Sequence, residues 1–202
     1  MEGYITIFNL EMVMTTATGS KTARLTGTAM LAAMVILFDY TLKYSGLKIP
    51  FPPMPYIKFD FTGVPIMLSY FIYGLPSAGT TSLVALLGIF MRKPSGLIDA
   101  SMKGIAEFTT ALGVALGVKL VGDRTLSSPI ARGVSIAAGL ILRILVMSVC
   151  NLIVLPGYRG VPYSVTVGLL PLLGVFNGMQ GAISAILGYT LYAAYTRRVT
   201  SA

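Results

Sequence analysis

Charge is scarce in this chain of 202 residues: only 11% of the residues are charged, whereas a typical soluble domain has about 25%. Hydrophobic residues make up 55% of the sequence. A chain with so few charged groups cannot cover its surface for water, so lipid is its natural solvent. No Asp, Glu, Lys or Arg occurs from Phe61 to Met91 or from Gly160 to Thr196. Each stretch exceeds the ~20 apolar residues that one membrane-spanning helix needs.

Histidine is absent, and cysteine occurs once, at Cys150. The lack of histidine removes the commonest metal ligand and proton shuttle, and a single cysteine cannot form an intramolecular disulfide. The sequence contains no phosphate-binding loop of the G-x-x-x-x-G-K-[ST] type and no visible nucleophile–base pair. We therefore expect no ATP hydrolysis by that route and no enzyme, and we predict neither a metal nor a cofactor.

The net charge of +8 would indicate nucleic acid in a soluble protein. In a membrane protein it reflects loop charges that set topology, so we expect no nucleic-acid partner. A transmembrane β-barrel would show segments of alternating polarity, whereas Met30–Phe38 and Gly139–Leu142 are continuous apolar runs. The predicted fold class is an all-α integral membrane bundle of six transmembrane helices.

The breaks between the apolar runs predict where these helices lie. The six expected spans are about 25–44, 62–74, 77–91, 97–121, 131–155 and 166–195. Pro156-Gly157 is expected to end the fifth span. The second span is short for a hydrocarbon core of ~30 Å, so we expect it to be tilted or half buried by its neighbours.

The predicted membrane domain covers residues 25–196, between a cytoplasmic leader (1–24) and a cytoplasmic tail (197–202). Glu2 and Glu11 stand where a secretory signal would be basic. Six spans put both termini on one side. That side would hold Lys21, Arg24, Lys119, Arg124, Arg132, Arg197 and Arg198, and the other side Lys43, Lys48, Lys58, Arg92, Lys93 and Arg159. The numbers differ little, but the first set sits at helix ends, so we place the termini in the cytoplasm and the protein in the cell membrane.

The loop between the first two spans, residues 45–60, is rich in proline and aromatic residues. It contains Pro50, Pro52, Pro53 and Pro55 together with Phe51, Tyr56 and Phe59. Proline at this density prevents a helix and favours a stiff, extended path. A stiff aromatic loop at the membrane surface is a plausible lid.

Polar side chains lie inside three predicted helices. Lys103 and Glu107 are four residues apart and can pair; Arg143 and Asn151 share a helix face; Asn177 and Gln180 are three residues apart. Buried polar groups in a membrane usually face a polar interior or a cavity. They indicate either a binding site or an interhelical hydrogen-bond cluster that only holds the bundle together. Because three helices contribute, we favour the binding site.

Small residues also recur at the spacing that lets helices approach closely in lipid. The pairs are Ala29 and Ala33, Gly113 and Gly117, and Gly174 and Gly178. Packing within the bundle is the simpler interpretation of each pair, and it is the one we prefer for the two glycine pairs.

Several segments resemble one known family. The stretch from Ile49-Pro50-Phe51 through Lys58-Phe59-Asp60-Phe61 to Val64-Pro65 is similar to the S-components of energy-coupling factor transporters, and most similar to their riboflavin-specific branch. The segments Arg143–Asn151 with Leu155-Pro156, and Pro171 with Phe176-Asn177, resemble the fifth and sixth helices of that branch. The resemblance covers most of residues 25–195.

The resemblance implies a six-helix vitamin-binding subunit that works with a transmembrane coupling subunit and two ATPase subunits. Riboflavin or a related small vitamin would enter from outside under the first loop and sit among helices four to six. Ala29 and Ala33 match the A-x-x-x-A pattern by which the first helix of the family meets the coupling subunit. The substrate-binding residues would be Lys58, Phe59, Asp60, Lys103, Glu107, Asn151, Asn177 and Gln180.

Two positions depart from the family pattern. Thr62-Gly63 stands where the family has Ser-Asp, and Gln180 stands where it usually has a lysine associated with ligand binding. A different vitamin or precursor is therefore an alternative ligand. A membrane enzyme or a purely structural bundle is a further alternative. A membrane enzyme should show a catalytic constellation of residues. A structural bundle would need neither the aromatic loop nor convergent amides.

Overall fold

A computed structural model describes residues 20–122, 126 and 128–200, so most of the predicted leader, Arg124 and the last two residues lie outside the described part. Within that part the chain forms six α-helices, a short 3-10 helix and two strands. In chain order they are α2 (Lys21–Tyr44), β1 (Ile49–Phe51), β2 (Met54–Phe59), α3 (Gly63–Tyr73), α4 (Leu75–Arg92), η1 (Pro94–Gly96), α5 (Leu97–Val121), α6 (Pro129–Arg159) and α7 (Tyr163–Thr200).

The prediction of an all-α membrane bundle is confirmed. Five of the described helices, all except α3, are long and apolar enough to cross a membrane, and the protein is a multi-pass membrane protein. The remaining helix, α3, has only 11 residues, although it too is apolar.

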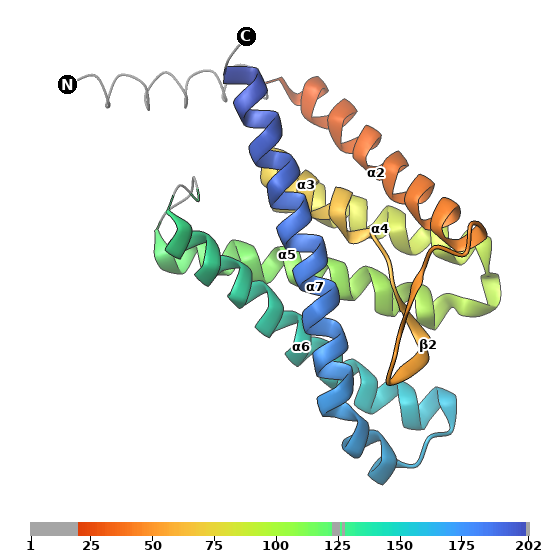
Figure 1. Cartoon of the computed structure of the whole chain (residues 1–202). Helices are drawn as coiled ribbons and strands as arrows, with labels where there is room; N and C mark the ends of the chain where they lie inside the picture. The colour runs from red at the N-terminus through yellow and green to blue at the C-terminus, as the bar shows by residue number, and fades with distance from the viewer. Residues whose placement is uncertain (1–19, 123–125, 127, 201–202) are drawn as a thin grey trace.

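Consecutive helices run in alternating directions, so each end of the bundle gathers segments far apart in sequence (Figure 1). Arg24, near the start of α2, donates a 2.9 Å hydrogen bond to the main-chain oxygen of Tyr73, where α3 ends. At the opposite end Arg92, at the end of α4, pairs with Asp39 near the end of α2. We call the first the terminal end, because α2 begins and α7 ends there, and the second the hairpin end.

The short helix α3 lies at the centre of the bundle, where it contacts α2, α4, α5 and α7. Its first five residues, Gly63–Met67, are buried. Ile66 and Met67 join a core cluster with Val35, Ala78, Ala85, Ala111, Val114 and Ala185. The expectation that neighbours bury this short span is therefore confirmed. A helix surrounded by other helices has no need to match the thickness of the hydrocarbon core.

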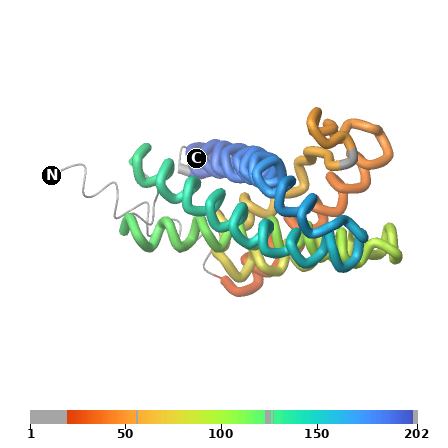
Figure 2. Tube along the Cα trace, turned by 90° about the horizontal axis from the view of Figure 1, so that it is seen from below, coloured from red at the N-terminus to blue at the C-terminus, as the bar shows by residue number. Residues whose placement is uncertain are grey.

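The proline-rich loop folds as a β-hairpin at the hairpin end. Strands β1 and β2 pair antiparallel, with Ile49 opposite Phe59 and Phe51 opposite Met54, and the register shifts between Pro50 and Phe51. Figure 2 shows the hairpin gathered at one edge of the helix bundle. The expectation of an extended path is confirmed. The pairing of its two halves as strands was not predicted.

The prediction that Pro156-Gly157 ends the fifth span is wrong, because α6 continues to Arg159. Proline at this position removes a single helical hydrogen bond, the one that residue 156 would donate to Leu152 O, in the last turn of the helix. The helix ends instead at Gly160, whose backbone is left-handed with φ of 66°. The amide of Val161 then donates to Leu155 O at 3.1 Å, which closes the helix end.

Small residues let α5 and α6 approach closely near the terminal end. A Cβ at Gly113 would lie 2.7 Å from the Cα of Gly139, and one at Gly117 would lie 2.5 Å from the Cα of Ser135. Gly174 and Gly178 both face Ile144 on α6. Packing within the bundle, the interpretation preferred for both glycine pairs, is confirmed.

Candidate functional site

Charged side chains at the hairpin end form an unbroken series of ion pairs, which we call the ionic chain. Its members in order are Arg92, Asp39, Lys48, Asp60, Lys103, Glu107 and Arg143. They come from α4, α2, the segments that flank the hairpin, α5 and α6. Positive and negative groups alternate, and the series begins and ends with arginine. The ionic chain therefore leads from the edge of the hairpin into the interior of the bundle.

Asp60, immediately after β2, is the centre of this chain. Its Oδ1 lies 2.7 Å from Lys103 Nζ, and its Oδ2 lies 3.6 Å from Lys48 Nζ. Thr62 adds hydrogen bonds to Oδ1 from its amide and its hydroxyl, at 3.2 and 2.5 Å. Burial alone would raise the pKa of Asp60, but Lys103 and Lys48 hold this pKa well below its ordinary value. The carboxylate is therefore charged throughout the physiological range.

Glu107 is fully buried on α5 between two cations. Its Oε1 lies 3.0 Å from Lys103 Nζ and 3.2 Å from Arg143 Nη1. Neither carboxylate oxygen receives an aligned hydrogen bond, so charge rather than directional bonding holds the group. On its other side lies Gly63, the first residue of α3, where a Cβ would overlap with Glu107 Oε2. The predicted pairing of Lys103 with Glu107 is confirmed, and a side chain at position 63 would displace Glu107 Oε2 or Ser184 Oγ.

Arg143 joins three helices in the interior. Its Nη1 donates to Ala106 O at 3.3 Å and to Thr110 Oγ1 at 3.0 Å, both on α5. Its Nε donates to Asn177 Oδ1 on α7 at 3.4 Å. The aliphatic part of the side chain passes Gly181, where a Cβ would lie 3.0 Å from Arg143 Cδ. These bonds satisfy a guanidinium group that is only 2% exposed.

The two asparagines lie on facing helices and are both buried. Asn151 shares the buried face of α6 with Arg143, where buried residues recur every four positions. Each amide also donates to its own helix, Asn151 to Met147 O at 2.7 Å and Asn177 to Leu173 O at 2.9 Å. These bonds fix the rotamers of two amides that lie beside a polar interior.

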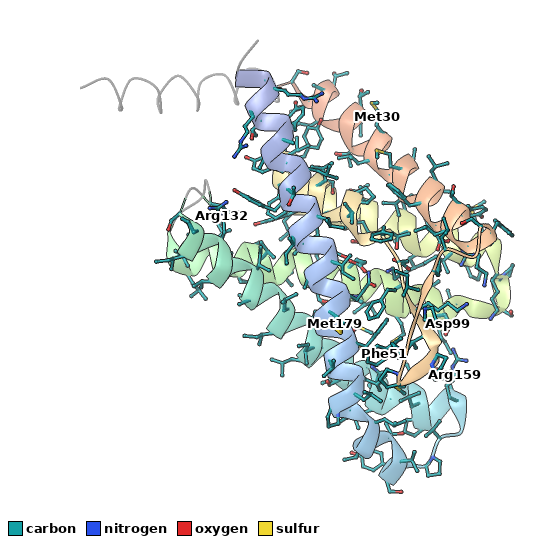
Figure 3. The ribbon with its side chains drawn as sticks, viewed as in Figure 1. Met30, Phe51, Asp99, Arg132, Arg159 and Met179 are labelled. Atoms are coloured by element: carbon teal, nitrogen blue, oxygen red, sulfur yellow. The ribbon has the colours of Figure 1, made fainter. Side chains whose placement is uncertain are left out.

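The hairpin places an aromatic cluster against α7. Phe51, Phe59 and Phe176 contact one another with ring centroids 5.0 to 5.7 Å apart. Leu155, Leu169, Leu172 and Leu173 pack around them. Figure 3 shows Phe51 where the hairpin lies against α7, and Asp99 and Arg159 at the same end of the molecule. Phe59 thus belongs to an apolar wall directly beside the polar Asp60.

Gln180, one turn beyond Asn177, contacts the main chain of Asp60. Its Oε1 accepts from the Asp60 amide at 3.2 Å, and its Nε2 donates to Asp60 O at 2.8 Å. The side chain is 2% exposed. It therefore links α7 to the residue at which the hairpin ends.

The structure joins six of the eight predicted substrate-binding residues, directly or through Arg143. Asn151 lies on the same buried face of α6 as Arg143, and Lys58 lies apart. Lys58 is exposed on β2, where Phe59 is buried, because successive strand residues point to opposite faces. The predicted docking pair, Ala29 and Ala33, is exposed on the outer face of α2, next to Met30, which is 66% exposed. Both alanines are thus free of contacts within the bundle core.

Asp39 and Arg92 join the site although sequence reasoning did not select them. Asp39 is buried on α2 and binds both Lys48, at 2.8 Å, and Arg92. The available signal was a carboxylate within the first apolar run, since an ionisable residue inside a spanning helix is a functional candidate by default. Arg92 carried no such signal, because it stands at a helix end.

The architecture is that of a multi-pass helical bundle with a hairpin over a polar interior. Comparisons with protein-family models and with curated proteins give no match. Among solved structures, one chain described as the S component of a bacterial ECF transporter aligns with a TM-score of 0.72 and 22% sequence identity. The alignment covers 89% of this chain and 99% of that one. The chain therefore has the fold of an energy-coupling factor S component over nearly its whole described length.

Proposed function

We propose that this protein is the substrate-capturing membrane subunit of an energy-coupling factor vitamin transporter, and that its ligand is riboflavin or a closely related compound. The observation that carries the proposal is the S-component fold together with a hairpin that covers a polar interior. The resemblance of the Lys58–Pro65 stretch to the riboflavin-specific branch adds to it.

The chemistry beside the hairpin suits such a ligand. A flat heteroaromatic ring needs aromatic and aliphatic walls, which Phe59, Phe176 and the leucines around them offer. A polyol tail needs donors and acceptors at fixed positions, because an unpaired buried polar group costs about 1–3 kcal/mol. Asn151 and Asn177 each supply both. The hairpin would act as the lid through which the ligand enters.

The remaining parts of the proposal concern orientation and partners. The described Lys and Arg residues divide evenly between the two ends, but all six at the terminal end lie in the first or last turn of a helix, whereas Lys48 and Lys58 at the hairpin end do not. We place the terminal end in the cytoplasm on this basis. Transport would then need a coupling subunit, with Ala29 and Ala33 as its docking surface on α2, and two ATPase subunits.

Purification followed by identification of the bound compound tests this function. We expect flavin absorbance in the purified protein, or quenching of riboflavin fluorescence at micromolar protein after any bound compound is removed. A heat-released fraction analysed by mass spectrometry identifies a different vitamin or precursor directly. Protein that is folded, carries no flavin and leaves riboflavin fluorescence unchanged would contradict the riboflavin assignment.

A further inference from the structure

The contact between Gln180 and Asp60 resembles one rung of a β-ladder made by a side chain. The amide of Gln180 accepts from the N–H of Asp60 and donates to its C=O, at 3.2 and 2.8 Å. Asp60 directly follows β2, so this contact stands where the hairpin joins α3. Both polar atoms of the Gln180 side chain are thereby engaged by main chain.

From this geometry we infer that Gln180 is a positioning residue that anchors the base of the hairpin to α7, and that it is not a ligand-binding group. The anchoring itself does not depend on what the protein binds. Only its consequence for a lid rests on the proposed function.

The anchor requires a specific side chain. One end must accept a hydrogen bond and the other must donate one, at the reach of a glutamine from α7. Lysine donates but cannot accept, so it would leave the buried Asp60 N–H without a partner. Methionine has a similar length and makes neither bond. The amide is therefore matched to the main chain of Asp60 rather than to a ligand.

A second attachment at the same point uses the side chain of Asp60. Its carboxylate binds Lys103 on α5 at 2.7 Å, while Lys48, on the other side of the hairpin, lies 3.6 Å from it. Asp60 is thus held to α7 through its main chain and to α5 through its side chain. In the described structure Phe51, Met54 and Phe59 of the hairpin pack against α7 through apolar contacts.

This difference in attachment defines how the hairpin can move. The base is held by a buried ion pair and two hydrogen bonds, and Phe51 and Met54 are buried in apolar contacts. If the hairpin acts as a lid, Asp60 is the point about which it would pivot. Opening would separate the aromatic cluster and leave the ionic chain intact.

Hydrogen exchange in the full-length, detergent-purified protein without added ligand tests the anchor. In Gln180→Met we expect the hairpin amides, residues 49–60, to exchange about 5- to 150-fold faster, as follows from the loss of two buried hydrogen bonds. Gln180→Lys should give a similar increase, because it cannot accept from Asp60. Ser184→Ala is the matched control: it removes a buried bond to Gln180 O on the same helix and should leave hairpin exchange unchanged.

Exchange in α4 serves as the check that a variant is folded. Unchanged hairpin exchange in a folded Gln180→Met protein would overturn the inference, and so would a Gln180→Lys protein that matches the unmodified one. If neither variant folds, the exchange rate of the Asp60 amide in the unmodified protein tests the inference instead. The Asp60 amide lies outside any strand or helix, so slow exchange supports its bond to Gln180, and exchange as fast as an exposed amide overturns it. None of these outcomes depends on whether the protein binds a flavin.

Discussion

The packing between α5 and α6 differs between its two halves. Toward the terminal end the helices meet through Gly113, Gly117, Ser135 and Gly139, so closely that main-chain atoms are in contact. Toward the hairpin end Arg143 of α6 meets Glu107 of α5 through charge, and Glu107 also pairs with Lys103 on its own helix. One half is apolar and has no room for a single additional methyl group, and the other half is polar.

This difference shows how α5 and α6 can form both a rigid scaffold and part of the candidate binding site. Close packing of small residues in lipid fixes the relative position of two helices through van der Waals contact alone. That fixed half then determines where the long polar side chains of the other half converge. The following substitutions test this division, from the largest expected effect on the purified protein to the smallest.

Valine at Gly139 should have the largest effect. Its Cβ would lie 2.6 Å from Val114 Cγ2 and 2.9 Å from Thr110 O, so the two helices would have to separate. We expect a loss of about 5 kcal/mol or more, above the ~1–3 kcal/mol typical of overpacked cores, because main chain blocks the added atoms. The measurement is a lower thermal unfolding midpoint in detergent. Gly133→Ala on the same helix is the control, because nothing lies within 4 Å of an added Cβ there. Equal losses in both variants would show that glycine serves α6 in some other way.

Glu107→Gln should have the next largest effect. It leaves Lys103 and Arg143 buried without their shared carboxylate, and breaking a buried pair costs about 3–5 kcal/mol. The control is Asp99→Asn, which breaks an ion pair with Arg159 whose side chains are 45% and 53% exposed. Exposed pairs contribute about 0–1 kcal/mol. A stable Glu107→Gln protein would mean that the polar half tolerates unbalanced charge.

Asn151→Leu and Asn177→Leu should both weaken ligand binding, and Asn177→Leu should also lower stability, because it removes the acceptor of Arg143 Nε. Each removes one amide, and we expect binding to weaken by about 1–3 kcal/mol, or roughly 5- to 150-fold. Cys150→Ser should do much less, because that side chain points about 100° away from Asn151. The measurement is ligand affinity at matched folding. Normal binding by both asparagine variants and weak binding by the Cys150 variant would assign the site to the other face of α6.

Ala29→Phe should have almost no effect on the isolated protein, because Ala29 is exposed on α2. If the alanines meet a partner helix, a bulky side chain prevents its close approach. Uptake in cells should then fall while ligand binding by the purified subunit is retained. Met30→Phe, about 100° around the helix, should reduce uptake less. An equal loss of binding and uptake would argue against a docking role.

The helices could be predicted from sequence because apolar runs and their breaks are local signals. The predicted limits of α5 agree with the structure, and both glycine pairs pack as expected. The end of α6 was predicted wrongly because proline near a helix end is tolerated, and the left-handed Gly160 provides the actual stop. Local sequence rules predict where the helices lie, but they do not predict which of two neighbouring helix-ending residues ends a helix.

The pairings within the site were predictable only where both partners lie on one helix. Lys103 with Glu107 follows from helical spacing alone. The pairing of Asp39 with Arg92, 53 residues apart, depends on how α2 and α4 pack. The contact of Gln180 with Asp60 spans 120 residues and involves main chain, which carries no sequence signal. Helix packing and hairpin register, rather than residue type, decide these contacts.

The shortness of α3 has an electrostatic consequence. Its 11 residues extend about 16 Å and the 25 residues of α5 about 37 Å, at 1.5 Å per residue. The helix therefore begins part-way along α5, and its first residue lies against Glu107. The free N–H groups of a helix start carry roughly half a positive charge, and the buried position of Gly63–Met67 screens this charge less than solvent would. A half-length helix is thus a fixed source of positive potential in the interior, and it favours electron-rich groups beside Glu107.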